Sequence, residues 1–301
     1  MALQVVEWAE TPPEFCQHGA VTVGNFDGAH RGHAKLIQTL TSIARPAVVL
    51  TFDPHPLTLL RPDQAPPLLT TLDDRAEYLH QLGADHVVVL RTTPELLQLS
   101  AEDFFRQILQ TRLHARAIVE GPNFRFGRNR TGDVEHLERW CLAAGIALHI
   151  VELQLLDGHE VSSSAIRRAL AEGRLTEALA ALGRPYRLRG LVGHGARRGR
   201  SLGFPTANLE GTQTLVPAYG VYAARAKGYP AAVHIGPNPT FGEAQPKIEA
   251  HLIGFSGDLY GQELVLEIVA RLREVRRFAS AEELRNQLRQ DIENARKELE
   301  R

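Results

Sequence analysis

The sequence predicts two folds in one chain, an α/β unit built on a parallel sheet followed by an all-β unit that closes as a small antiparallel β-barrel. Apolar β-rich runs alternate with helical patterns from residue 20 to about 155, which is typical of a parallel sheet. Closely spaced strands without intervening helices follow from residue 187, which favours a barrel. At residues 182–185 the sequence pattern changes from helical to short glycine-rich strands. We therefore place the domain boundary between residues 1–183 and 184–301, although a single domain stays an alternative.

The first unit is predicted to hold five parallel strands. They are Ala20–Val23, Ala47–Phe52, His86–Leu90, Ala117–Glu120 and Ala147–Leu153. Thr71 with Asp74 three residues on marks a helix start. Ser100 with Asp103 marks another in the same way. A helical run over Ser163–Leu182 ends this unit.

The second unit is predicted to hold five antiparallel strands and a terminal helix. The strands are Arg187–Val192, Val221–Arg225, Ala231–Ile235, Lys247–Ile253 and Leu264–Arg271. Ser280 with Glu283 forms a capping box, and Leu284, Leu288 and Ile292 then recur every four residues. This pattern predicts an amphipathic helix that packs on the barrel, with a partner surface as the alternative.

Composition restricts the partners and the compartment. The net charge of −1 creates no global field that would draw the protein to nucleic acid or to an anionic membrane, so any anion binding must be local. No apolar run approaches the roughly 20 residues that a membrane span requires. Cys16 and Cys141 are far apart, and residues 1–7 lack a signal pattern. We therefore expect a cytoplasmic protein without nucleic-acid or membrane partners.

Residues 24–33, Gly-Asn-Phe-Asp-Gly-Ala-His-Arg-Gly-His, place two imidazoles where a buried strand turns into a helix. Backbone N–H groups at a helix start favour anions, and His30 and His33 are spaced to reach one ligand from one helix face. This pattern predicts a phosphate site. The alternatives are an ordinary turn and a zinc pair, but zinc requires a third ligand and none stands at a usual spacing nearby.

A second phosphate-like pattern lies at residues 162–168, Ser-Ser-Ser-Ala-Ile-Arg-Arg, just before a helical run. Hydroxyls and guanidiniums at a helix start can bind several phosphate oxygens together. The alternative is a serine N-cap with surface arginines. Because ligands of parallel sheets lie beyond the carboxyl ends of the strands, the two patterns can hold a triphosphate between them, with imidazoles stabilising charge at phosphorus.

These two segments resemble the HxGH and SSTxxR motifs of the nucleotidyltransferase superfamily, with Ser164 in the place of threonine. Residues 51–56, Thr-Phe-Asp-Pro-His-Pro, and residues 121–127, Gly-Pro-Asn-Phe-Arg-Phe-Gly, are similar to flavin-side segments of the prokaryotic bifunctional riboflavin kinase/FAD synthetase family. The resemblance implies a Rossmann-like FMN adenylyltransferase domain. It implies ATP binding by Gly24, Phe26, Asp27, His30, His33, Ser163, Ser164 and Arg167, with His30 and His33 catalytic. It implies FMN binding near Phe52, Pro54, His55, Asn123 and Arg125.

Residues 190–208 combine five glycines with Arg197, Arg198 and Arg200. Glycines let a backbone approach a ligand and arginines neutralise phosphate, although a basic hairpin without special purpose is the alternative. Residues 204–208, Phe-Pro-Thr-Ala-Asn, resemble the PTAN motif of flavokinases, and this resemblance implies that Thr206 and Asn208 hold the Mg²⁺ of Mg-ATP. The implied ATP-binding residues are Gly193, Gly195, Arg198, Gly199, Gly203, Pro205, Thr206 and Asn208.

Residues 247–252, Lys-Ile-Glu-Ala-His-Leu, resemble the flavokinase strand that carries the catalytic carboxylate. The resemblance implies that Glu249 is the base that takes a proton from a ribityl hydroxyl during phosphoryl transfer. The alternative is an exposed glutamate on an alternating strand. Asp258–Gly261 and Arg273–Phe278 resemble a barrel turn and a flavin-side flap, while Gly254 stands where the family often has aspartate.

The resemblance implies one enzyme with two activities. A flavokinase-like barrel converts riboflavin to FMN with Mg-ATP, and the first unit transfers AMP from a second ATP to FMN. The expected ligands are riboflavin, FMN, FAD, ATP, ADP, pyrophosphate and Mg²⁺, without zinc, in a monomer or weak homo-oligomer. One alternative is a single-activity nucleotidyltransferase with a non-catalytic substrate-binding barrel, against which Thr206 and Asn208 argue. Another is a flavin-binding or nucleic-acid-binding regulatory module, which the net charge and the 6% aromatic content support poorly.

Overall fold

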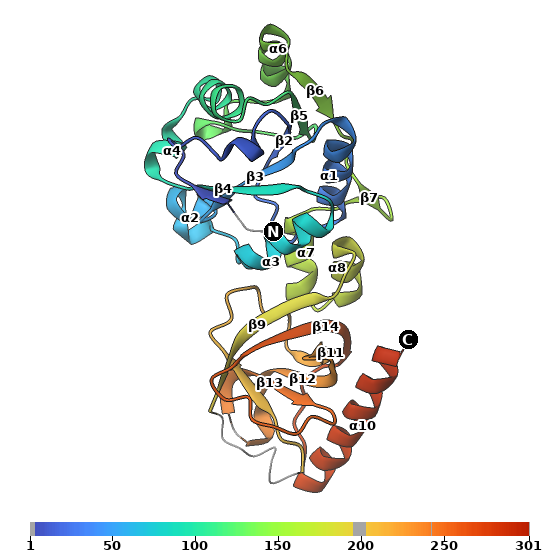
Figure 1. Ribbon diagram of the computed structural model, residues 1–301. Coiled ribbons are helices and arrows are strands. Elements are labelled where there is room, and N and C mark those ends of the chain that lie inside the picture. Colours follow the sequence, from blue (N-terminus) through green and yellow to red (C-terminus); the bar gives the residue numbers. More distant parts are fainter. Residues whose placement is uncertain (1–3, 195–202, 242, 301) are drawn as a thin grey trace. The chain divides into compact units, whose positions relative to one another are not determined.

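A computed structural model describes residues 4–194, 203–241 and 243–300 (Figure 1). The chain divides into two compact units, one of residues 1–66 and 70–162 and the other of residues 67–69 and 163–301. By its packing, the helical run after residue 162 therefore groups with the second unit.

The first unit is built on a six-stranded sheet in the order β1-β4-β3-β2-β5-β6. All neighbouring strands are parallel. The strands are β1 Gln4–Val6, β2 Ala20–Val23, β3 Ala47–Asp53, β4 His86–Arg91, β5 Ala117–Glu120 and β6 Ala147–Ile150. The five predicted strands are confirmed, although β6 ends three residues earlier than predicted. The edge strand β1 was missed because three residues are too few to show a period.

Helices cover both faces of this sheet (Figure 1). They are α1 Arg31–Ile43, α2 Pro56–Leu60, α3 Leu72–Gln81, α4 Pro94–Gln98, α5 Ala101–Phe104, the π-helical η3 Phe105–Arg112 and α6 Val134–Ala144. The 3-10 turns are η1 Glu14–Cys16, η2 Pro62–Gln64 and η4 Arg128–Arg130, and a small hairpin pairs β7 Leu155–Leu156 with β8 His159–Glu160. Side chains of α1 and α3 pack on one face, and those of α5, η3 and α6 pack on the other.

Both predicted helix caps in the first unit are confirmed. The hydroxyl oxygen of Thr71 accepts from the N–H of Asp74 at 3.2 Å. That of Ser100 accepts from the N–H of Asp103 at 3.0 Å. Helix α6 was not predicted, although Asp133 caps its start and Gly145 ends it at a φ of 69°.

The strand order changes direction at β2, because β3 and β4 lie on one side of it and β5 and β6 on the other. In open parallel sheets the ligand crevice lies outside the carboxyl ends of the strands at such a switch point. The segment that begins at Gly24 follows β2, and the segment that begins at Gly121 follows β5. The fold therefore sends both predicted site segments toward one crevice.

The second unit contains a closed barrel in the order β10-β13-β12-β11-β14-β9, with every neighbouring pair antiparallel. The strands are β9 Tyr186–Gly193, β10 Ala207–Glu210, β11 Gly220–Ala226, β12 Tyr229–Asn238, β13 Glu243–Leu252 and β14 Glu263–Arg273. The predicted barrel is confirmed. Its four-residue strand β10 was missed because it begins inside the PTAN segment, where the prediction concerned ligand binding.

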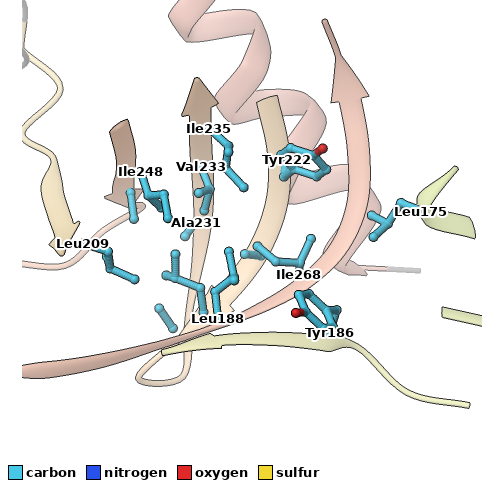
Figure 2. Close-up of a cluster of buried hydrophobic side chains, with 14 of the residues drawn as sticks. Leu175, Tyr186, Leu188, Leu209, Tyr222, Ala231, Val233, Ile235, Ile248 and Ile268 are labelled. Carbon is cyan, nitrogen blue, oxygen red and sulfur yellow. The ribbon is translucent and has the colours of Figure 1, made fainter. Parts of the chain in front are cut away.

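Large apolar side chains fill the barrel, including Leu188, Tyr222 and Val233 (Figure 2). The unit also holds helices α7 Ser163–Ala171, α8 Leu175–Leu182 and α10 Ala281–Glu300. The predicted single run over residues 163–182 is two helices, because Gly173 adopts a φ of 75° between them. Helices α7 and α8 share the barrel's apolar cluster.

The terminal helix α10 packs on the outside of the barrel, as predicted. Ala295 and Leu299 of α10 form a buried cluster with Ala223 and Ile253 of the barrel unit. Within residues 4–194, 203–241 and 243–300, no helix is both long enough and apolar enough to cross a membrane.

Candidate functional sites

The segment after β2 has a constrained backbone. Gly24 continues the sheet through its N–H, which donates to the carbonyl of Leu50 at 3.0 Å. Phe26 and Ala29, neither of them glycine, have φ angles of 49° and 37°. Such angles cost on the order of 1–3 kcal/mol each and persist where the surroundings hold them, often at functional sites.

Asp27 fixes this segment from inside. Its side chain is 2% exposed, and one carboxylate oxygen accepts from the N–H of Thr70 at 3.0 Å and from the Thr70 hydroxyl at 2.9 Å. The Thr70 hydroxyl oxygen in turn accepts from the N–H of Gly28 at 3.1 Å. A guanidinium nitrogen of Arg75 lies 3.7 Å from the same carboxylate. Asp27, to which the family resemblance assigns ATP binding, thus also shapes the segment from a buried position.

His30 and His33 lie together at the start of α1. Their rings stack with centroids 3.6 Å apart and planes 17° apart. The ring of His33 also packs against Phe26 in a T-shaped arrangement, with the ring centroids 4.9 Å apart. His30 is the N-cap residue and not part of the helical face, so stacking, in place of the predicted shared helix face, brings the rings together.

A hydrogen bond determines which nitrogen of His33 faces a ligand. The backbone N–H of His30 donates to Nδ1 of His33 at 3.3 Å. Because Nδ1 accepts, a neutral His33 carries its proton on Nε2. Nε2–H and the N–H groups at the start of α1 are then donors of the kind that bind phosphate oxygens.

The start of α1 also meets the segment that leads to the serine run. A Cβ added to Gly32 would lie 3.2 Å from the His30 ring and 3.2 Å from the carbonyl oxygen of Val161. Val161 directly precedes Ser162, the last residue of the first unit. Ser163 and Ser164 then begin α7 in the second unit. Their pairing with residues 24–33 stays a prediction.

Arg167 lies on α7, and its Nε–H donates to the carbonyl of Pro67 at 2.8 Å. This bond lies within the second unit, which includes residues 67–69.

The segments after β2 and β3 meet through Asn25 and His55. The Nδ1 of His55 accepts from the N–H of Leu57 at 3.1 Å, and its Nε2 lies 3.0 Å from the side-chain amide nitrogen of Asn25. The hydroxyl of Thr51 also donates to the carbonyl of Asn25 at 3.1 Å. Phe52 packs partly against the core, and Pro54 is exposed. No sequence pattern singled out Asn25.

The segment after β5 carries Asn123 with an exposed side chain. Arg125 is held by Asp133, whose carboxylate lies 2.6 Å from its guanidinium. The same carboxylate contacts Nδ1 of His136 at 2.7 Å. Hydrogen bonds from His136 are the main reason that the pKa of Asp133 lies well below its usual range. Of the two predicted flavin contacts in this segment, Asn123 faces solvent and Arg125 already has a protein partner.

The second candidate site is a row of residues on the outer face of the barrel. Asn208 of β10 lies opposite Gly193 of β9 and opposite Glu249 of β13. Glu249 in turn lies opposite His234 of β12. Side chains in such cross-strand positions have Cβ atoms about 4.5–5.5 Å apart. The predicted base and one predicted magnesium ligand are therefore neighbours.

Glu249 is half-buried, and its carboxylate accepts from the side-chain amide of Asn238 at 3.1 Å. His234 flanks it on β12, and its Nε2 lies 3.2 Å from the carbonyl oxygen of Pro237. A carbonyl only accepts, so Nε2 carries the proton. Burial lowers the pKa of His234, and the opposite charge of Glu249 partly offsets this effect. Neither Asn238 nor His234 was predicted, because their role depends on strand register.

Thr206 lines a pocket of about 120 Å³ that connects the PTAN segment with the turn at residues 257–260. The pocket walls include Pro205, Phe255 and Tyr260. The carbonyl of Pro205 lies 2.8 Å from Nδ1 of His251, which anchors the segment to β13. The predicted turn and the predicted ATP-binding segment thus share one pocket.

Of the other predicted ATP-binding positions, Gly193 ends β9, and a Cβ there would lie 2.2 Å from Cδ of Glu210. Gly203 adopts a φ of 90° before the PTAN segment. Gly195, Arg198 and Gly199 lie outside the described residues.

A parallel α/β unit with a histidine pair at a helix start, joined to a small barrel with an outer Asn-Glu row, is the architecture of a nucleotidyltransferase unit combined with a flavokinase-type barrel. Family models match accordingly, "FAD synthetase" over residues 13–165 and "Riboflavin kinase" over residues 182–299. The chain belongs to the family of bifunctional riboflavin kinases/FMN adenylyltransferases.

Individual relatives agree along nearly the whole chain. A bifunctional riboflavin kinase/FMN adenylyltransferase of Escherichia coli K12 is 35% identical over 297 residues, covering 96% of this chain and 94% of the relative. One of Pseudomonas fluorescens is 36% identical over 284 residues, covering 91% of each. A solved structure from Streptococcus pneumoniae, described as a macrolide-efflux protein, has a TM-score of 0.86 and 29% identity, and covers 98% of this chain and 99% of that one.

Proposed function

We propose that this chain makes FAD from riboflavin in two steps, each on its own domain. Residues 184–301 phosphorylate riboflavin to FMN with ATP. Residues 1–183 transfer AMP from a second ATP to FMN and release pyrophosphate. The observation that carries the proposal is the occurrence, in one chain, of a stacked histidine pair at the start of α1 and of Asn208 opposite Glu249 on the barrel.

In the kinase step, Glu249 takes the proton of the ribityl hydroxyl while the hydroxyl oxygen forms a bond to the γ-phosphorus. The bond between that phosphorus and the bridging oxygen breaks, and ADP leaves. The amide of Asn238 holds the Glu249 carboxylate in place for this transfer. A base acting in this way contributes about 10²- to 10⁴-fold to a rate.

Magnesium fits the donor set beside this base. The hydroxyl of Thr206 and the amide oxygen of Asn208 are hard oxygen ligands of the type that Mg²⁺ prefers, and Asn208 lies next to Glu249 across the strands. We propose that these two residues hold the ion together with the ATP phosphates. When bound, the ion supplies positive charge that offsets the phosphate charge.

In the adenylyl step, a phosphate oxygen of FMN attacks the α-phosphorus of ATP, and the bond to the departing pyrophosphate breaks. His30 and His33 stabilise the charge that develops on the phosphate oxygens, and the N–H groups at the start of α1 act with them. Ser163, Ser164 and Arg167 bind the triphosphate. No covalent enzyme intermediate is required.

FMN lies, in this proposal, beside Phe52, Pro54, His55 and Asn123, on the segments that follow β3 and β5. The contact between Asn25 and His55 supports one shared crevice for the two substrates. Arg125 shapes the segment through Asp133 and acts on FMN from its rim.

We place this chemistry in a reducing cytoplasm, with free thiols at Cys16 and Cys141, in a monomer or weak homo-oligomer without zinc or nucleic acid. Within the described residues, no three His, Cys, Asp or Glu side chains lie where they could hold a metal ion.

The decisive experiment is a time course. The protein is incubated with riboflavin, ATP and Mg²⁺, and FMN and FAD are separated by chromatography. FMN that rises first and is then replaced by FAD is the expected result. FMN alone, or FAD formed only from added FMN, would assign a single activity and contradict the proposal.

A further inference from the structure

Glu120 is a buried acidic side chain that neither proposed step uses. It is the last residue of β5, and it is 2% exposed. One of its carboxyl oxygens accepts from the backbone N–H of Val23 at 2.7 Å. Val23 is the last residue of β2, so this bond joins the ends of the two strands at the point where the strand order changes direction.

The bond continues a strand pairing that otherwise stops. The parallel register between β2 and β5 covers only Ala20 with Ala117 and Val21 with Ile118. Val23 lies two residues farther along β2, beyond the last residue of β2 that pairs with β5. The Glu120 side chain reaches across and satisfies the Val23 N–H, which would otherwise be buried without a partner and cost about 1–3 kcal/mol.

The ends of these strands are held from both sides. Gly24, which follows Val23, donates its N–H to the carbonyl of Leu50 on β3 at 3.0 Å. The carbonyl of Glu120 accepts from the N–H of Val151, beyond β6, at 2.8 Å. The side-chain bond between Glu120 and Val23 connects these two halves of the sheet. Directly beyond it begin the phosphate segment at Gly24 and the flavin-side segment at Gly121.

Burial also affects the ionisation of the Glu120 carboxyl group. Burial raises its pKa well above the ordinary value, and the Val23 N–H offsets this only in part. Burial therefore favours the neutral form of this acid. An ionised carboxylate between the two segments would repel the phosphates of ATP and FMN, whereas the neutral acid keeps the hydrogen bond without the charge.

We propose that Glu120 is a positioning residue for AMP transfer, which holds the ends of β2 and β5 at the separation that seats the Gly24 segment and the Gly121 segment across one crevice. The role rests on the adenylyltransferase function proposed for the first unit and is independent of the kinase. Glu120 acts through these backbone segments and touches no reacting atom.

The test compares E120Q, E120M and E120D with I118V. Glutamine keeps the acceptor oxygen and the length, methionine keeps the length without the acceptor, and aspartate keeps the acid but shortens the reach by one methylene. Ile118 lies two residues earlier on the same strand and is fully buried, so I118V loosens the core without touching the bond to Val23. Thermal unfolding followed by circular dichroism establishes that each variant is folded.

Steady-state rates of FAD formation from FMN and ATP are the readout, with riboflavin phosphorylation measured in the same samples. E120M and E120D are expected to raise the KM for ATP and for FMN about tenfold, because a misplaced segment weakens binding of both substrates. E120Q should stay within about threefold of the parent, and FMN formation should be unchanged in all variants.

A folded E120M or E120D with parental KM values would overturn the positioning role, and so would I118V raising KM as much as they do. If E120M does not fold, the comparison of E120D with E120Q decides the matter alone, since both retain a polar acceptor. A parent protein that makes no FAD would instead contradict the adenylyltransferase function itself.

Discussion

The side-chain amide of Asn238 donates to the carboxylate of Glu249 across 3.1 Å, from the end of β12 to the middle of β13. One oxygen of the carboxylate is thereby fixed, and the group is held on the outer face of the barrel beside Asn208. A base with a restrained orientation meets a substrate hydroxyl without first losing rotamer freedom, which is a source of rate acceleration.

Replacing Glu249 with glutamine should lower FMN formation by about 10²- to 10⁴-fold, because glutamine keeps the contact with Asn238 but cannot take a proton. FAD formation from added FMN should stay at the parental rate. The matched control is Glu267→Gln, which alters another glutamate of the barrel that pairs with Arg187. FMN formation by E249Q at the parental rate would show that Glu249 is not the base.

Replacing His33 with alanine should impair FAD formation and leave riboflavin phosphorylation intact, the reverse of the effect of E249Q. It removes the Nε2 donor and the ring against which His30 stacks, so FAD formation should fall about 10²- to 10³-fold while riboflavin is still phosphorylated. His114→Ala is the control, since His114 is an exposed histidine of the same unit. Loss of both activities in a folded H33A protein would contradict the division of labour.

Replacing Gly32 with alanine tests the packing at the start of α1. The new Cβ would lie 3.2 Å from the His30 ring and from the Val161 carbonyl oxygen, closer than most Cβ contacts. The ring can move more easily than the backbone, so we expect His30 to shift and FAD formation to fall about 10- to 100-fold. FMN formation should be unaffected. A crystal structure of the variant with the His30 ring in its parental position would contradict this explanation.

Local patterns were sufficient to predict most of the fold. Strands β2 to β5 are short runs of β-branched and apolar residues, and Thr71 and Ser100 are recognisable caps, because these signals depend on a few neighbouring residues. Helices α7 and α8 were predicted as one helix, because Gly173 separates them without changing the apolar pattern.

The contacts that build the sites join residues far apart in the sequence, and no local pattern contains them. Asp27 reaches Thr70 across 43 positions, and Glu120 reaches Val23 across 97. The resemblance implies that Asp27 binds ATP, and its buried bonds to Thr70 also hold the segment in place. Register alone brings His234 beside Glu249.

Acid should destabilise the barrel through His234. Burial lowers its pKa in the folded protein below the ordinary value of 6.5, while the unfolded chain retains that value. Below about pH 6.5 the unfolded state therefore binds more protons, so the free energy of unfolding falls as the pH falls toward the folded pKa, by at most about 1.4 kcal/mol per pH unit. The charged groups that act on His234 in the fold are Glu249, which raises its pKa, and Arg273, which lowers it.

His234→Asn removes this proton uptake while keeping a polar side chain that can donate to Pro237. Differential scanning calorimetry of the full chain at pH 7.5 and pH 5.5 measures the effect. The parent should lose more stability than H234N between these two values, because only the parent gains a proton on unfolding. Parallel losses in the two proteins would show that His234 titrates in the folded state as it does in the unfolded chain.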